Sequence, residues 1–234
     1  MNAIAPSASF VDLRRFAERV LPLAAPSGLA RQCLPLPVGP VSVGVLSVPP
    51  GSHEERADAD EFVVVHEGGV TLHAGDVAVP LAAGASAVIR AGTTLRWTAE
   101  APASLVFMRY AAAGEGESGL VPIDPDADLQ PSGAPSAELL TTPTPACRNH
   151  TDYRSGDGEF MCGTWDSTPY ARNAMRYRHY ELMHLLDGKV TFVDAAGVRG
   201  TFGRGDIFLV RQGAECSWDS QVYVRKVYAI WRPA

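Results

Sequence analysis

Short apolar runs of strand length alternate with turn residues along most of this chain. They gather in two regions, from about residue 40 to 110 and from about residue 139 to the end, and include VSVGVLSV, EFVVVHEG, DIFLVRQG and VRKVYAIW. Runs of this length, rich in β-branched and aromatic residues and bounded by Gly or Asp, are typical of strands. The chain also has 22 Gly and 18 Pro with few long helical patterns. The pattern therefore predicts an all-β protein with many turns.

One segment near the N-terminus follows a helical pattern instead. Its apolar residues recur at a spacing that places them on one face: Phe10, Leu13, Phe16, Ala17 and Val20. Ser9 can cap the first turn, and Asp12 suits the third helical position, where a carboxylate is favoured. We predict a short helix within residues 1–30 that lies against a sheet.

A segment of low complexity separates the two strand-rich regions. Residues 111–136 are rich in Gly, Pro, Asp and Ser, a composition typical of a linker. Within this segment, residues 120–123 are expected to dock as an edge strand. We predict an N-terminal helical segment over 1–30, a first domain over 31–112, a linker over 113–138 and a second domain over 139–234.

The second strand-rich region repeats the first at an offset of about 120 residues. A glutamate precedes a glycine by seven residues in both, and two glycines eight residues apart follow, with a tryptophan five residues later. The matching positions are Glu61/Glu181, Gly68/Gly188, Gly84/Gly205, Gly92/Gly213 and Trp97/Trp218. So many matches in one register indicate a duplicated domain.

These spacings resemble the two motifs of the cupin family. The E-x6-G part of the first motif and the G-x5-x-x-G start of the second both occur twice. The segments Gly163-Thr-Trp165-Asp-Ser-Thr168-Pro169, Tyr177-x3-Glu181 and Trp218-x5-Val-Arg-Lys226-Val-Tyr228 are similar to those of ethanolamine-utilisation Q-type and (S)-ureidoglycine aminohydrolase-like cupins. The resemblance implies a bicupin, with two jelly-roll (double-stranded β-helix) barrels in tandem.

The resemblance also locates the metal ligands of the family, which are three histidines and the glutamate. In the C-terminal half the histidine positions hold Ala174, Arg176 and Cys216, and in the N-terminal half Glu54, Arg56 and Leu95. We therefore expect no cofactor and no metal. One alternative stays open, because a strand bulge could turn His179 inward to form a three-ligand divalent metal site with Glu181 and Cys216. Otherwise His179 is expected in a loop beside the barrel mouth.

Where the family has a histidine and a glutamate, this chain has Arg-x4-Glu in both halves, Arg176–Glu181 and Arg56–Glu61. We predict that each pair forms a buried ion pair, because an unpaired buried charge is costly. A small-molecule pocket is predicted in the C-terminal barrel, with a weaker counterpart in the N-terminal one. The candidate ligand-binding residues are Arg176, Tyr177, Glu181, Cys216, Trp218, Lys226, Tyr228, Arg56, Glu61 and Trp97.

Several of these residues could instead have a purely structural role. The ion pairs could merely fill barrels that have lost their metal, and Trp97 could be a core residue. Cys216 is expected to be an inert buried thiol rather than a nucleophile. No catalytic residue is assigned. Asp187 and Gly188 are predicted to form the hairpin turn into the next strand.

Composition excludes several classes of function. The net charge is −6, and no cluster of Lys and Arg is long enough to follow a nucleic-acid backbone. No apolar run reaches the length of a membrane span, and we expect no signal peptide. The four cysteines lack metal or redox spacing, which suits a reducing cytoplasm. A homodimer is expected because jelly-roll barrels leave sheet edges and apolar faces that commonly pair.

Three functions are consistent with these observations. The first is a protein that binds a small molecule, such as a carboxylate, without a tightly held metal. The second is a metal-dependent enzyme that acts on a small amine or carboxylate, either aminohydrolase-like or isomerase-like. The third is a structural dimer with two filled barrels. The fold alone does not decide among them.

Overall fold

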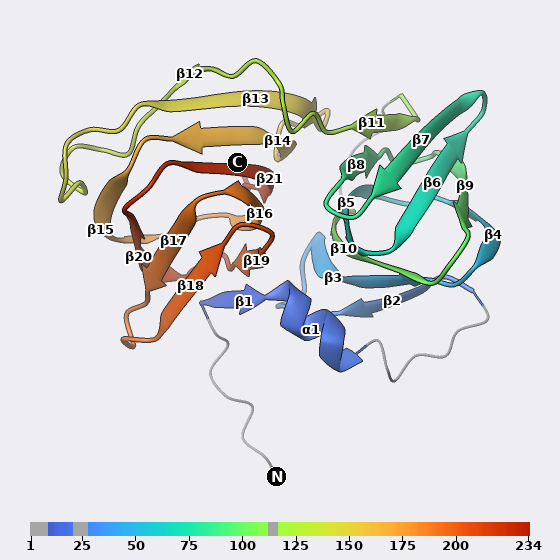
Figure 1. Ribbon diagram of the computed structural model, residues 1–234, viewed down its shortest axis with the longest axis horizontal. Helices are drawn as coiled ribbons and strands as arrows, with labels where there is room; N and C mark the ends of the chain where they lie inside the picture. The colour runs from blue at the N-terminus through green and yellow to red at the C-terminus, as the bar shows by residue number, and fades with distance from the viewer. Residues whose placement is uncertain (1–8, 21–27, 112–116) are drawn as a thin grey trace, which may run out of the picture. The chain divides into compact units, whose positions relative to one another are not determined.

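A computed structural model describes residues 9–20, 28–111 and 117–234. Strands make up more than half of the described chain, which contains one short helix, and this confirms the predicted all-β class. The strands form two jelly-roll barrels, each made of two antiparallel sheets around an apolar interior (Figure 1). No helix among the described residues is long and apolar enough to cross a membrane.

The N-terminal barrel combines a six-stranded and a four-stranded sheet within the described chain. The larger has the order β11 (Leu120–Pro122), β8 (Ser86–Ile89), β5 (Asp60–Glu67), β10 (Ala103–Tyr110), β3 (Val41–Val48) and β2 (Ala30–Cys33). The smaller has the order β4 (Gly51–Arg56), β9 (Thr94–Ala99), β6 (Gly69–Ala74) and β7 (Val77–Ala82). β11 lies at a sheet edge, which confirms the edge strand predicted within the linker.

The C-terminal barrel has the same plan. Its larger sheet, seven-stranded in the described chain, has the order β1 (Phe10–Asp12), β19 (Ile207–Val210), β16 (Tyr180–Asp187), β21 (Val224–Trp231), β14 (Phe160–Ser167), β13 (Cys147–Arg154) and β12 (Gln130–Ser132). Its smaller sheet has the order β15 (Tyr170–Arg176), β20 (Glu215–Ser220), β17 (Lys189–Val193) and β18 (Arg199–Gly203). Strands 120 residues apart thus occupy matching places, as expected for a duplicated domain.

The two compact units of the chain are interleaved in sequence, whereas the predicted domains follow one another in order. One unit holds the described residues of 1–12, 125–150 and 164–234, and the other holds those of 13–124 and 151–163. The predicted linker, 113–138, contributes to both units, and its residues 113–116 lie outside the described chain. Parts of the predicted N-terminal segment, 1–8 and 21–27, also lie outside it.

The predicted helix exists, but it begins later than expected. Residues Phe10–Asp12 form strand β1, which pairs antiparallel with β19, and helix α1 covers Leu13–Val20. Ser9 does not cap the helix, since its hydroxyl donates to Asp194 at 2.9 Å. Strand pairing and the packing of Phe10 against aromatic rings of its barrel outweigh helical propensity at this point. Helix α1 lies against β3 and β10, with Leu13, Phe16 and Ala17 buried.

Gly188 does not form a hairpin turn as predicted, because β16 and β17 belong to different sheets. It carries the chain from one sheet of the barrel to the other with φ of +80°. A Cβ here would lie 2.0 Å from the carbonyl oxygen of Tyr223. Gly68 occupies the matching corner of the N-terminal barrel, with φ of +76°. The glycine of the repeated E-x6-G spacing is therefore required by the corner between sheets.

Candidate functional site

Glu181 is the charged residue at the centre of the C-terminal barrel. Side chains alternate along β16, so Glu181 points to the same side as Met183 and Leu185, which belong to the apolar interior. Lys226 on β21 donates from Nζ to Glu181 Oε1 at 2.7 Å. His179, in the bend before β16, places Nε2 3.2 Å from Glu181 Oε2. Each carboxylate oxygen of Glu181 therefore has a partner. The inward orientation predicted for Glu181 is confirmed.

The pair of Lys226 and Glu181 keeps the carboxyl group ionised. Burial alone would raise the pKa of Glu181, but the charge of Lys226 and the hydrogen bond with His179 outweigh it. The pKa of Glu181 consequently lies well below its ordinary value. At neutral pH the barrel interior therefore holds an ionised carboxylate beside the amino group of Lys226.

Two indole rings flank the ammonium group. Lys226 Nζ lies 4.6 Å from the ring centroid of Trp165 and 5.3 Å from that of Trp218. Trp218 is itself stacked on Tyr170 at 5.5 Å. Trp218 and Lys226 were predicted from the sequence to bind a ligand, but both are buried and neither lines the cavity at the end of this barrel. Trp165 was not predicted, although it stands in the Gly-Thr-Trp segment that carries the family resemblance.

Arg172 is a further buried cation that the sequence analysis missed. Its guanidinium group donates to the hydroxyl of Tyr177 at 2.8 Å and to the carbonyl oxygen of Cys216 at 2.9 Å. Cys216 is fully buried, and burial raises the pKa of its thiol to about 11. The thiol is therefore neutral at physiological pH, as expected for an inert cysteine. Tyr228 is buried on β21, and its hydroxyl lies 3.5 Å from the carbonyl oxygen of His150.

The predicted ion pairs between Arg176 and Glu181 and between Arg56 and Glu61 do not form. Both arginines are exposed at the ends of strands β15 and β4. The inward residue in β4 is Glu55, one position earlier. The motif alignment was off by one residue at this point, and a shift of one residue in a strand moves a side chain to the opposite face.

The cations that meet Glu61 come from strands distant in sequence. Arg31 on β2 donates to both oxygens of Glu61, at 3.0 and 2.8 Å, and also to both oxygens of Glu55. Arg109 on β10 places Nε 3.5 Å from Glu61 Oε2. Trp97 is fully buried and donates its indole N–H to Glu55 at 2.9 Å. Neither arginine stands in a motif, so no sequence signal singled them out.

A cavity of about 840 Å³ opens at one end of the C-terminal barrel. Its lining comes from the end of β15, the turn before β20 and the segment after β21, and includes Arg176, Arg178, Arg232 and Gln212. Tyr177 and His179, both buried, also line it. His179 thus links the cavity to Glu181. Within the described chain, none of the three arginines forms a salt bridge with an acidic side chain.

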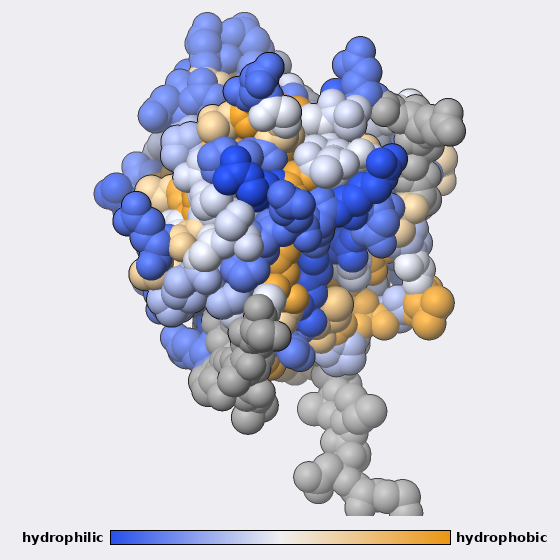
Figure 2. Space-filling view, turned by 90° about the vertical axis from the view of Figure 1, so that its right-hand side faces the viewer, coloured by the Kyte–Doolittle hydropathy of each residue, from blue (hydrophilic) through white to orange (hydrophobic). Residues whose placement is uncertain are grey.

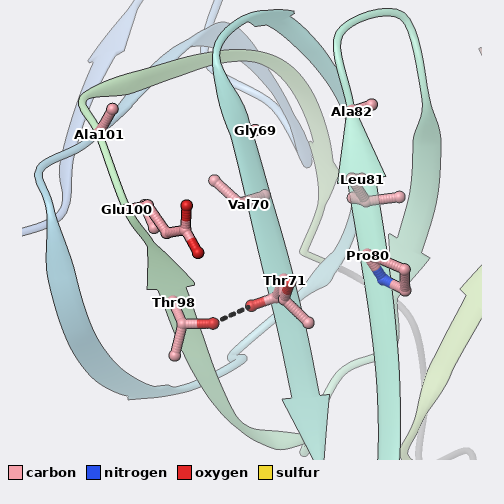
Figure 3. Close-up of a pocket in the computed structure, with 10 residues that line it drawn as sticks. Gly69, Val70, Thr71, Pro80, Leu81, Ala82, Thr98, Glu100 and Ala101 are labelled. Carbon is pink, nitrogen blue, oxygen red and sulfur yellow. Dashed lines mark hydrogen bonds between the residues drawn. The ribbon is translucent and has the colours of Figure 1, made fainter.

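A second cavity, of about 600 Å³, lies on the outer face of β6, β7 and β9. Figure 3 shows the Glu100 carboxylate between β9 and β6, and the hydroxyl of Thr98 directed at the backbone oxygen of Thr71 at 3.5 Å. On the side of the molecule seen in Figure 2, hydrophobic residues are scattered among hydrophilic ones. Apart from Thr71, Thr98 and Glu100, the residues that line this cavity are Gly, Ala, Val, Leu and Pro, and we assign no site to it.

The profile of the EutQ-like cupin domain matches residues 36–104 and 154–228, which together span more than half of the chain. The chain belongs to this cupin family. A Pseudomonas syringae pv. tomato protein of unknown function is 34% identical and superposes with a TM-score of 0.82, over 86% of each chain. No curated protein matches this cupin. The finer resemblance to (S)-ureidoglycine aminohydrolase-like cupins stays a prediction.

More distant solved cupins share the fold. A conserved-barrel cupin from Leptotrichia buccalis is 9% identical, with a TM-score of 0.59 over 99% of this chain and all of its own. A salicylate 1,2-dioxygenase from Pseudoaminobacter salicylatoxidans is 14% identical, with a TM-score of 0.60 over 97% of this chain and 86% of its own. At such identities the likeness concerns the fold alone.

The described residues around Glu181 do not fit a metal. In the part of the chain that the structure describes, no three His, Cys, Asp or Glu side chains are grouped so that they could hold an ion. His179 and Glu181 contact each other, but Cys216 does not complete a three-ligand group with them. The ammonium of Lys226 is bonded to the carboxylate that such a site would need.

Proposed function

We propose that this cupin binds a small carboxylate in the cavity at the end of its C-terminal barrel. The observation that carries the proposal is that three arginines, Arg176, Arg178 and Arg232, are among the residues that line one cavity. Guanidinium groups bind carboxylates through two parallel hydrogen bonds. A hydrogen bond from the side-chain amide of Gln212 to the carbonyl oxygen of Arg178, at 3.1 Å, joins two of the lining segments.

The buried part of the cavity supports recognition of the rest of the ligand. Tyr177 offers an aromatic face, and His179 offers an imidazole oriented by Glu181. A concave site with an aromatic wall and a few polar groups is typical of small-molecule binding. In this proposal Arg176 contacts the ligand from the lining of the cavity, rather than forming the buried ion pair predicted from the sequence.

The metal-dependent enzyme that the sequence also allowed has no donor set among the described residues that supports it. The proposal is therefore limited to binding, and no reaction is assigned. The homodimer and the cytoplasmic location stay predictions.

Isothermal titration with acetate, pyruvate and benzoate tests this proposal. We expect at least one of these probes to bind, and Arg178→Gln to weaken its affinity about tenfold, the equivalent of about 1.4 kcal/mol. Arg199→Gln is the matched control, because Arg199 is exposed on β18 and does not line the cavity. No binding of any probe, or an equal loss in the control variant, would contradict the proposal.

A further inference from the structure

Lys226 lies in surroundings that are built for a cation. Its ammonium group is 2.7 Å from Glu181 Oε1 and 3.3 Å from Met183 Sδ, and it lies over the rings of Trp165 and Trp218. An anion, a polarisable sulfur and two aromatic faces all attract positive charge. The side chain is only 7% exposed. A buried lysine is rare unless it is paired, so this environment accounts for its burial.

The same environment opposes a divalent ion. A metal ligated by His179 and Glu181 would have to break the contact between them, and Lys226 holds the other oxygen of Glu181. It would also lie within a few ångströms of the ammonium charge, where the repulsion is strong because little water screens it. The lysine and a metal therefore compete for one place.

In the N-terminal barrel a different cation lies beside the equivalent glutamate. Glu61 occupies the place on β5 that Glu181 occupies on β16, and Arg31 donates to both of its oxygens. Arg31 comes from β2 and Lys226 from β21, which are not matching strands of the two barrels. In each barrel a cationic side chain from one of its own strands thus contacts the equivalent buried glutamate.

We propose that Lys226 is the built-in cation of the C-terminal barrel and takes the place of a divalent metal beside Glu181. The protein is then metal-independent at this site. Loss of Lys226 removes the competing charge, so that Zn²⁺ or Ni²⁺ can bind weakly to the two donors that remain, His179 and Glu181. This inference goes beyond the proposed function and does not depend on carboxylate binding.

Metal analysis of the full chain, prepared without a histidine tag, tests this inference. The protein is treated with EDTA, incubated with Zn²⁺ or Ni²⁺ at pH 7.5, separated from free metal by gel filtration and measured by elemental mass spectrometry. We expect the wild type to retain no metal beyond the background that Glu181→Gln retains. Lys226→Ala should retain more metal than the wild type, well below one equivalent because only two donors remain, and should lose this excess when His179→Gln is added.

The chain contains two lysines, and the other, Lys189, is exposed on β17, so Lys189→Ala is a matched control. Near-stoichiometric metal in the wild type that Glu181→Gln abolishes would overturn the inference. So would a folded Lys226→Ala that retains no more metal than Lys189→Ala. The wild-type measurement decides the matter alone if Lys226→Ala does not fold.

Discussion

Replacing Lys226 by methionine tests the energetics of the barrel centre. The substitution keeps the length of the side chain and removes the ammonium group that lies 2.7 Å from Glu181 Oε1. At an effective dielectric constant of about 20, two charges at this separation attract each other by roughly 6 kcal/mol before solvation is counted. The exposed fractions of the two side chains are only 7% and 10%. Breaking such a pair on one side costs about 3–5 kcal/mol.

We expect Lys226→Met to lower the free energy of unfolding in urea by about that amount at pH 7.5, and the melting temperature by about 6–20 °C. The double variant Lys226→Met/Glu181→Gln should be less destabilised than the sum of the single variants, since it leaves no buried charge without a partner. Lys189→Met, which changes an exposed lysine of β17, should alter stability by no more than about 0.5 kcal/mol.

The pH dependence separates a lost charge from lost packing. In the wild type the pKa of Glu181 lies below its ordinary value. The ionised carboxylate therefore contributes fully to the free energy of unfolding above about pH 4.5, and this contribution is lost as the pH falls from there toward the lowered pKa. In Lys226→Met, burial without the ammonium raises the pKa of Glu181, and protonation relieves the penalty. The stability difference should therefore narrow as the pH falls from neutral toward about 4.5. A variant within about 1 kcal/mol of the wild type, with an unchanged pH dependence, would refute this reasoning.

Three further predictions concern other parts of the chain. Gly188→Ala should destabilise the protein by more than about 2 kcal/mol in urea, and clearly more than Gly197→Ala, because both glycines have positive φ but only Gly188 would press its Cβ against a backbone carbonyl oxygen. Phe10→Ala should cost about 3 kcal/mol by removing a ring that packs in the C-terminal barrel; an unchanged urea midpoint would show that β1 contributes little. Iodoacetamide at pH 8 should alkylate the exposed Cys33 and spare Cys216, whose pKa is about 11; equal labelling by peptide mass spectrometry would contradict its burial.

The sequence predicted the architecture because its signals are local or periodic. Alternating apolar positions indicate strands, and the repeat from Glu61 to Gly92 and from Glu181 to Gly213 indicates the duplication. The inward placement of Glu181 followed from the same register. The start of the helix at Leu13 could not be predicted, because Phe10 instead joins a strand about 200 residues away.

The partners of the two glutamates were decided only by the tertiary structure. The sequence paired each glutamate with an arginine five residues earlier, Arg56 or Arg176. In the structure both arginines are exposed, because the motif alignment was one residue out of phase with the alternation of side chains along the strand. Arg31 and Lys226 reach Glu61 and Glu181 because sheet pairing brings distant strands together. The sequence thus determined that each barrel buries a carboxylate. Only folding determined which cation neutralises it, because a buried charge is stabilised by whichever opposite charge the fold places within a few ångströms.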